Sequence, residues 1–173
     1  MFLVITYPKL SKEDFNFIQE YRKINDPLYY DVVDPHFTIV FPVDGLTREE
    51  FSKEIKELLK NEKGFNFNLK SAVVNQDFSK EYFHEFLVPD EGFSGFIKLH
   101  DKLYSNNLKK HLRFDIDFIP HVGIGNHKEF NVCKKRVDIL NDKDLSIKGS
   151  VGSVDIVEYI DNKVVILERI ELA

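Results

Sequence analysis

Apolar and polar residues alternate along several short segments of the chain and recur every three to four residues along others. The first pattern is typical of a strand with one buried face, and the second of an amphipathic helix. Strands are predicted at 2–7, 36–41, 65–75, 82–89, 118–125, 145–160 and 163–172. Helices are predicted at 11–24, 47–61, 95–112 and 129–141.

Local signals mark several ends of these elements. Ser11 precedes the first helix as a candidate N-cap, and Thr47 with Glu50 has the spacing of a capping box at the start of the second. A turn at 161–162 is predicted to join the last two strands into a hairpin. The glycines of GSVGS (149–153) have the wrong spacing for a nucleotide-binding loop, so they are interpreted as a bulge in a long strand.

Two of the predicted strands share a pattern. Residues 34–42 read DPHFTIVFP and residues 119–126 read IPHVGIGN, and in both an apolar residue follows the histidine at the first and third positions. The two histidines lie 85 residues apart, and each strand is followed by a helix and then a strand pair. This order indicates an internal duplication. Because no low-complexity linker divides the halves, residues 1–173 are expected to form one bilobal domain.

Strand alternation assigns the side chains of these segments to faces. His36 and Thr38 point to one face, and Phe37 points to the other, toward a core. The same rule places His121 and Gly123 together. If an approximate two-fold axis relates the halves, the two histidines meet across a common cleft.

Such a pair suits phosphodiester chemistry. A neutral imidazole can take a proton from an attacking water or hydroxyl while an imidazolium gives one to the leaving oxygen, because the ordinary pKa of histidine is about 6.5. The Thr38 hydroxyl would hold a phosphate oxygen as charge builds in the transition state. The arrangement requires no metal or other cofactor. The alternative is two ordinary strands that each contain a histidine.

Composition narrows the partners and the location. With one cysteine among 173 residues, disulfide frameworks and Cys-based zinc sites are excluded. The net charge of −5, with dispersed Lys and Arg, argues against long duplex nucleic acid but allows a local pocket for a phosphorylated ligand or an RNA end. Residues 2–7 resemble a strand rather than a leader, and no apolar run is long enough to span a bilayer. A cytoplasmic monomer that does not bind membranes is expected.

Four other histidines are scattered along the chain. His84 either lines the cleft and contacts a base or ribose, or is a half-buried strand residue; His127 is interpreted in the same two ways, at the cleft mouth or outside it. His100 has helical spacing from apolar neighbours and is predicted either to pack or to lie at the surface, and His111 can complement the carbonyls at a helix end. Their spacing matches no metal site, so no zinc is predicted.

Four further side chains are candidates for a role in the site. Tyr7 ends the first strand, where an aromatic ring can stack on a nucleobase or simply pack at the rim. Arg22 and Asp26 are predicted to pair near the end of the first helix and to act structurally. Cys133 falls in a helical pattern and is predicted to pack rather than react.

The residues around both histidines resemble a known family. YRKINDPLYYDVVDPHFTIVFP is similar to the first motif region of the bacterial 2'-5' RNA ligase-like proteins of the two-histidine (2H) phosphoesterase superfamily, and FIPHVGIG is similar to the second. The second motif is usually Phe-x-Pro-His-apolar-Thr-apolar. The order of elements agrees along nearly the whole chain. The residues that carry the first motif here are Arg22, Asp26, Pro27, Pro35, His36, Thr38, Phe41 and Pro42.

The resemblance implies an α+β, bilobal fold with two antiparallel sheets around a central cleft and helices on the outside. It also implies hydrolysis of a 2',3'-cyclic phosphate or a 2'-5' phosphodiester, or formation of 2'-5' linkages, on a nucleotide or RNA end. His36, Thr38 and His121 match catalytic positions of the family.

Two positions depart from the family pattern. Gly123 stands where the family has Thr or Ser, so one phosphate-holding hydroxyl is missing, and such a loss typically costs about 10² to 10³ in rate. Glycine also lets a ligand or water approach the backbone, so a water or an N–H can substitute. Asn126 stands near a point where many relatives carry a basic residue. Both positions, with Tyr7, are kept as candidate substrate contacts.

Three hypotheses remain open from the sequence. The first is a metal-independent phosphodiesterase or ligase that uses both histidines. The second is a catalytically impaired module that binds a nucleotide or phosphate in the same cleft. The third is an interaction domain whose cleft is vestigial.

Overall fold

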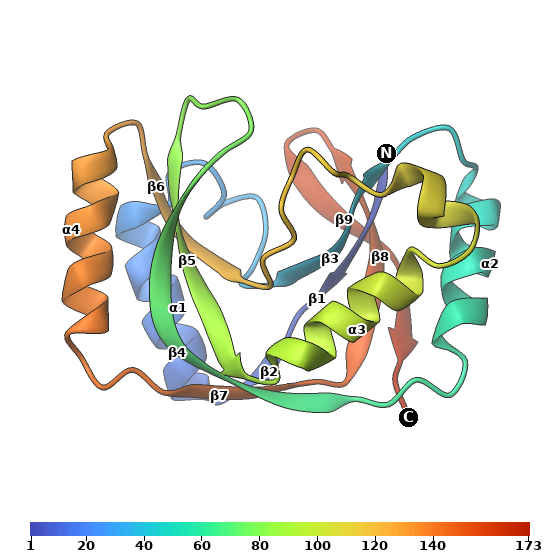
Figure 1. Cartoon of the computed structure of the whole chain (residues 1–173), viewed down its shortest axis with the longest axis horizontal. Coiled ribbons are helices and arrows are strands. Elements are labelled where there is room, and N and C mark those ends of the chain that lie inside the picture. Colours follow the sequence, from blue (N-terminus) through green and yellow to red (C-terminus); the bar gives the residue numbers. More distant parts are fainter.

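Nine strands form two antiparallel sheets that face a central space, with the helices on the outside (Figure 1). The computed structural model describes residues 1–173. The predicted α+β fold with two antiparallel sheets is confirmed. The helices are α1 (Lys12–Asn25), α2 (Arg48–Leu59), α3 (Phe93–Leu103) and α4 (Phe130–Asn141), with a short 3₁₀ helix at Asn107–His111.

The two sheets draw their strands from distant parts of the chain. The four-stranded sheet has the order β3 (Phe37–Val43), β1 (Phe2–Thr6), β8 (Ser153–Ile160), β9 (Lys163–Glu171). The five-stranded sheet has the order β2 (Lys9–Leu10), β7 (Ile147–Val151), β4 (Phe65–Gln76), β5 (Phe83–Glu91), β6 (Val122–His127). The strands that follow the two Pro-His pairs, β3 and β6, are therefore each at one edge of a sheet.

The local signals in the sequence form as predicted. The Ser11 hydroxyl accepts a hydrogen bond from the Asp14 N–H at 3.0 Å and begins α1. Thr47 and Glu50 form a complete capping box at the start of α2. The turn at 161–162 places both residues at positive φ, 49° and 60°, as a tight hairpin between twisted strands requires.

Three element boundaries differ from the prediction. The segment 145–160 is two strands rather than one bulged strand: β7 pairs with β2 and β4, whereas β8 pairs with β1 and β9. The alternation of apolar and polar residues continues through Gly152. It therefore gives no sign that the chain passes from one sheet to the other at that residue. The strand predicted at 118–125 begins only at Val122, after Pro120, whose nitrogen has no hydrogen to donate to a ladder.

The helix predicted at 95–112 ends at Leu103. Beyond it, Glu54 of α2 accepts hydrogen bonds from the backbone N–H and the side-chain amide of Asn107, both at 2.8 Å. The Tyr104 hydroxyl accepts a bond from the Phe41 N–H at 3.0 Å. These contacts bind the chain to α2 and β3 and redirect it into the 3₁₀ helix.

A continuous hydrophobic core connects the sheets to the helices. Phe37 of β3 stacks on Phe96 of α3 with ring centroids 4.1 Å apart and meets Phe67 of β4 edge-on at 5.2 Å. This contact fixes the buried face of β3, and with it the opposite face that carries Thr38. None of the helices has the length and apolarity needed to cross a membrane.

Candidate functional site

A cavity of about 710 Å³ lies between the two sheets. His36 and Thr38 line it from the start of β3, and His121 and Gly123 line it from the start of β6. Phe37, on the opposite face of its strand, is fully buried. The structure therefore brings both predicted half-sites to one cavity.

Both imidazoles are held in the same way. Nδ1 of His36 lies 2.9 Å from the carbonyl oxygen of Asp34, and Nδ1 of His121 lies 2.6 Å from the carbonyl oxygen of Ile119, in each case two residues earlier. A carbonyl oxygen only accepts, so Nδ1 must carry the hydrogen. In the neutral rings, Nε2 therefore keeps its lone pair and can receive a proton.

Burial lowers the pKa of both rings. The pKa of His121 falls to about 4, mainly because desolvation disfavours the imidazolium, and a positive charge on His36 would lower it further. The pKa of His36 is also lowered, again chiefly by burial, although its bond to the Asp34 carbonyl opposes the shift. An anionic phosphate between the rings would stabilise the imidazolium form of either one.

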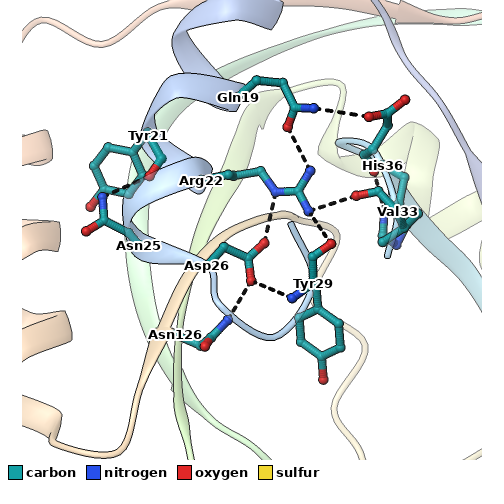
Figure 2. A network of polar contacts seen from close by, with 10 residues as sticks. Gln19, Tyr21, Arg22, Asn25, Asp26, Tyr29, Val33, His36 and Asn126 are labelled. Atoms are coloured by element: carbon teal, nitrogen blue, oxygen red, sulfur yellow. Dashed lines mark hydrogen bonds and ion pairs between the residues drawn. The ribbon is translucent and has the colours of Figure 1, made fainter. Parts of the chain in front are cut away.

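A buried ion pair holds the segment before His36 (Figure 2). Nε of Arg22 lies 2.9 Å from Oδ2 of Asp26, and the two side chains are only 2% and 3% exposed. Nη2 of Arg22 donates to the carbonyl oxygens of Tyr29 at 3.0 Å and Val33 at 2.8 Å. The predicted Arg22–Asp26 pair is confirmed, and it fixes the loop that leads to the first histidine.

The same network reaches both half-sites (Figure 2). Gln19 accepts a bond from Arg22 at 2.9 Å and donates one to the Asp34 carboxylate at 3.1 Å, next to the carbonyl that orients His36. On the other side, Nδ2 of Asn126 in β6 donates to Oδ1 of Asp26 at 2.5 Å. One buried cluster thus connects α1, the loop before β3 and the strand that follows His121.

A second buried contact holds the segment before His121. Nδ1 of His100 in α3 lies 2.7 Å from the carbonyl oxygen of Ile39 in β3. Its ring stacks on Phe118 with centroids 3.7 Å apart and planes 12° apart. His100 therefore packs, which is one of its two predicted placements, and it connects the segment before His121 to the strand that carries Thr38.

Comparison with known proteins agrees with this geometry. The model of the 2'-5' RNA ligase superfamily matches residues 8–163. The chain belongs to this superfamily. No curated protein matches the sequence.

Solved structures of similar fold cover nearly the whole chain. LigT of Escherichia coli complexed with 3'-AMP has a TM-score of 0.65 and 16% identity, over 99% of this chain and 97% of LigT. TT0787 of Thermus thermophilus has a TM-score of 0.62 and 15% identity, over 99% of this chain and 97% of TT0787. Usb1 of Kluyveromyces marxianus has a TM-score of 0.57 and 12% identity, over 96% of each chain. At these identities the likeness shows the fold alone.

Gly123 stands where the resemblance seen in the sequence predicts Thr or Ser. A Cβ built on Gly123 meets no atom within 4 Å, and its φ lies outside the left-handed region, so neither space nor conformation requires glycine. Gly125 differs, because a Cβ there would lie 2.9 Å from the buried Glu85 carboxylate. A threonine at 123 would therefore fit, with its side chain in the open space of the cavity.

Two predicted substrate contacts lie outside the cavity lining. Asn126 is only 1% exposed, and its side-chain amide donates a hydrogen bond to Asp26. It therefore belongs to the buried cluster. The Tyr7 ring meets the His36 ring edge-on, with centroids 6.2 Å apart. Burial, with help from Asp34, raises the pKa of Tyr7 to about 12, so its hydroxyl stays protonated.

Other side chains considered from the sequence also lie away from the cavity lining. Nδ1 of His127 accepts a bond from the Glu129 N–H at 3.0 Å beside the start of α4. His111 has a buried Nε2 without a partner, so the predicted contact with helix-end carbonyls is not made. Cys133 is buried, as predicted, and burial raises its pKa to about 12.

Several lining residues were missed by the sequence reasoning. Alternation along β5 places Phe86 on the same face as His84, but it does not predict that Phe86 stacks on His121 with centroids 3.5 Å apart. The remaining residues come from loops and strand ends, where no periodicity exists to place them. They are Tyr29, Val32, Val33, Asn75, Gln76, Asp77, Phe78, Lys80, Asp115, Ile116, Asp117, Ile119, Tyr159 and Val164.

Proposed function

We propose that the protein is a metal-independent phosphodiesterase that acts on a 2',3'-cyclic phosphate or a 2'-5' phosphodiester of a nucleotide or RNA end. The observation that carries this proposal is the matched pair of imidazoles. His36 and His121 each donate Nδ1–H to a backbone carbonyl and leave Nε2 free, and both line one cavity with the Thr38 hydroxyl.

The mechanism follows from general acid and base catalysis. One neutral imidazole takes a proton from water as the water oxygen attacks phosphorus. The bond from phosphorus to one ribose oxygen breaks, and the other ring, as imidazolium, gives that oxygen a proton. The Thr38 hydroxyl donates a hydrogen bond to a non-bridging oxygen as negative charge builds there. In the reverse direction the same two histidines would form a 2'-5' linkage, so hydrolysis and ligation use the same groups.

The cavity suits a nucleotide in size and lining. Its volume of about 710 Å³ lies within the range of small-molecule sites, about 300 to 1,000 Å³. Tyr29, Phe78 and Tyr159 line it with partly exposed rings on which a base can stack. The fold similarity to LigT complexed with 3'-AMP and with ATP supports a nucleotide as the ligand.

The test is turnover in the presence of a chelator. Wild type, His36→Ala and His121→Ala are incubated with 2',3'-cyclic nucleotides and a 2'-5' linked dinucleotide, and products are separated by chromatography. We expect wild type to form products, and each variant to lose about 10² to 10⁴ in rate. His127→Ala, outside the cavity lining, should behave as wild type. Absence of product from wild type, or full activity in both variants, would overturn the proposal.

A nucleotide-binding module with little turnover is the second candidate, and the missing hydroxyl at Gly123 favours it. Loss of one oxyanion donor typically costs about 10² to 10³ in rate. This candidate predicts saturable binding of 3'-AMP to wild type without any product from the cyclic nucleotides. It also predicts that Gly123→Thr gains activity, since the space for the added side chain is open.

A further inference from the structure

A third histidine lines the cavity and has no hydrogen-bonding partner. His84 of β5 is 9% exposed, and neither of its ring nitrogens makes a hydrogen bond to the protein. Its closest charged neighbour is the Asp77 carboxylate, 4.0 Å from Nε2. Burial lowers the pKa of His84, and Asp77 opposes this shift. His84 lines the cavity, so a ligand oxygen there can accept a hydrogen bond from its ring.

His84 pairs with Asn126 of β6, the strand that carries Gly123, and both His84 and Gly123 line the cavity. Phe86 of β5 lies opposite Gly123 of β6, and His84 precedes Phe86 by two residues on the same face. The His84 and Phe86 rings lie 5.9 Å apart, and Phe86 stacks in turn on His121. Phe86 contacts both histidine rings, so a ligand group that touches both His84 and His121 must pass beside Phe86, where the space at Gly123 is open.

Two neighbours hold the His84 ring in place. Tyr29 stacks against it with centroids 6.2 Å apart, and the Tyr29 carbonyl is bound by the buried Arg22. Asp77 is fixed at the β4–β5 turn, where Oδ1 accepts bonds from the Glu81 and Tyr82 N–H groups at 3.0 and 3.3 Å. An imidazolium at His84 would therefore have a carboxylate beside it and the cavity in front of it.

We propose that His84 donates a hydrogen bond to a phosphate oxygen of the bound nucleotide, in place of the hydroxyl that Gly123 lacks. The inference rests on the proposed function only for the identity of the ligand as a phosphate ester. It explains why the second half-site keeps its histidine and an unobstructed space although its Thr or Ser is absent.

The experiment measures binding of 3'-AMP by calorimetry, which requires no turnover. His84→Phe keeps a ring between Tyr29 and Phe86 but removes both nitrogens, and His84→Gln keeps an N–H donor. A hydrogen bond to a charged group is typically worth 1.5 to 3 kcal/mol, so His84→Phe should raise Kd about 10- to 100-fold and His84→Gln less. His127→Phe is the control and should leave Kd unchanged.

Gly123→Thr supplies the reciprocal test. If His84 replaces the hydroxyl, Gly123→Thr should recover most of the lost affinity in the His84→Phe background and add little to wild type. Equal gains in both backgrounds, or wild-type affinity in His84→Phe, would overturn the inference. Such a result with turnover intact would leave the proposed function standing.

A measurement on the unsubstituted protein guards against misfolding of the variants. In a sample labelled with ¹⁵N-histidine, 3'-AMP should shift the ring nitrogen resonances of His84. An unchanged His84 signal under saturating 3'-AMP, or no binding of 3'-AMP at all, also overturns the inference.

Discussion

Arg22 and Asp26 form the residue-level contact on which the geometry of both half-sites depends. Arg22 uses Nε, Nη1 and Nη2 in hydrogen bonds, and Asp26 accepts from Arg22, the Tyr29 N–H and Asn126. A buried ion pair stabilises little by itself, because desolvation offsets the attraction. Removing one member, however, leaves the other charge buried and uncompensated.

Asp26→Asn should therefore destabilise the fold strongly. Loss of one partner of a buried pair typically costs about 3 to 5 kcal/mol of unfolding free energy, measurable by urea denaturation. Asp138→Asn breaks the exposed Lys134–Asp138 pair and is the matched control, with an expected cost below about 1 kcal/mol. Similar losses in the two variants would show that burial of Arg22 and Asp26 is not what matters.

At the scale of elements, some boundaries depend on neighbours in sequence and others on distant residues. Ser11, Thr47 and the turn at 161–162 could be predicted because each signal lies within a few residues of its effect. The end of α3 could not, since Glu54 binds Asn107 from 53 residues away. The sequence did not predict that β7 and β8 join different sheets, because this too depends on strands that are distant in sequence. The face of β3 that carries Thr38 was predictable from alternation, whereas the cavity-lining loops have no period to reveal them.

Thr47→Ala should weaken α2 without affecting the cavity. The capping box satisfies N–H groups at the start of this helix, and its removal typically costs about 1 kcal/mol of unfolding free energy. No α2 residue lines the cavity, so nucleotide binding should remain as in wild type. Thr47→Ser keeps the hydroxyl and should retain most of the stability. A loss of 3'-AMP affinity in folded Thr47→Ala would contradict this separation of cap and site.

For the whole molecule, buried imidazoles connect stability to pH. Burial is the main reason that the pKa values of His36, His84, His100 and His121 are all lowered in the folded protein. Well above a pH of about 6.5 these rings are neutral in both the folded and the unfolded chain. As the pH falls below that value, the unfolded chain binds protons that the folded protein does not, so stability decreases.

The free energy of unfolding should therefore fall between pH 7 and pH 5 and continue to fall toward the folded pKa of His121, about 4. Full protonation across that shift corresponds to at most about 3 kcal/mol for His121 alone. Urea denaturation at a series of pH values measures the slope, and His121→Asn should make it shallower while the other three rings still contribute. A stability that stays constant from pH 7 to pH 5 would show that the rings are not desolvated in the folded protein.

The change of sheet at Gly152 also has a consequence for how the protein is made. β1 is central in its sheet, with β3 on one side and β8 on the other, and β8 and β9 are the last strands of the chain. During synthesis, β1 and the first histidine strand emerge early, yet one edge of β1 stays unpaired until more than 150 residues have been made. Pairing between such distant segments is slow, and in the meantime an unpaired strand edge can pair with other chains. A ribosome-bound chain that stops before β8 therefore exposes an unpaired edge of β1.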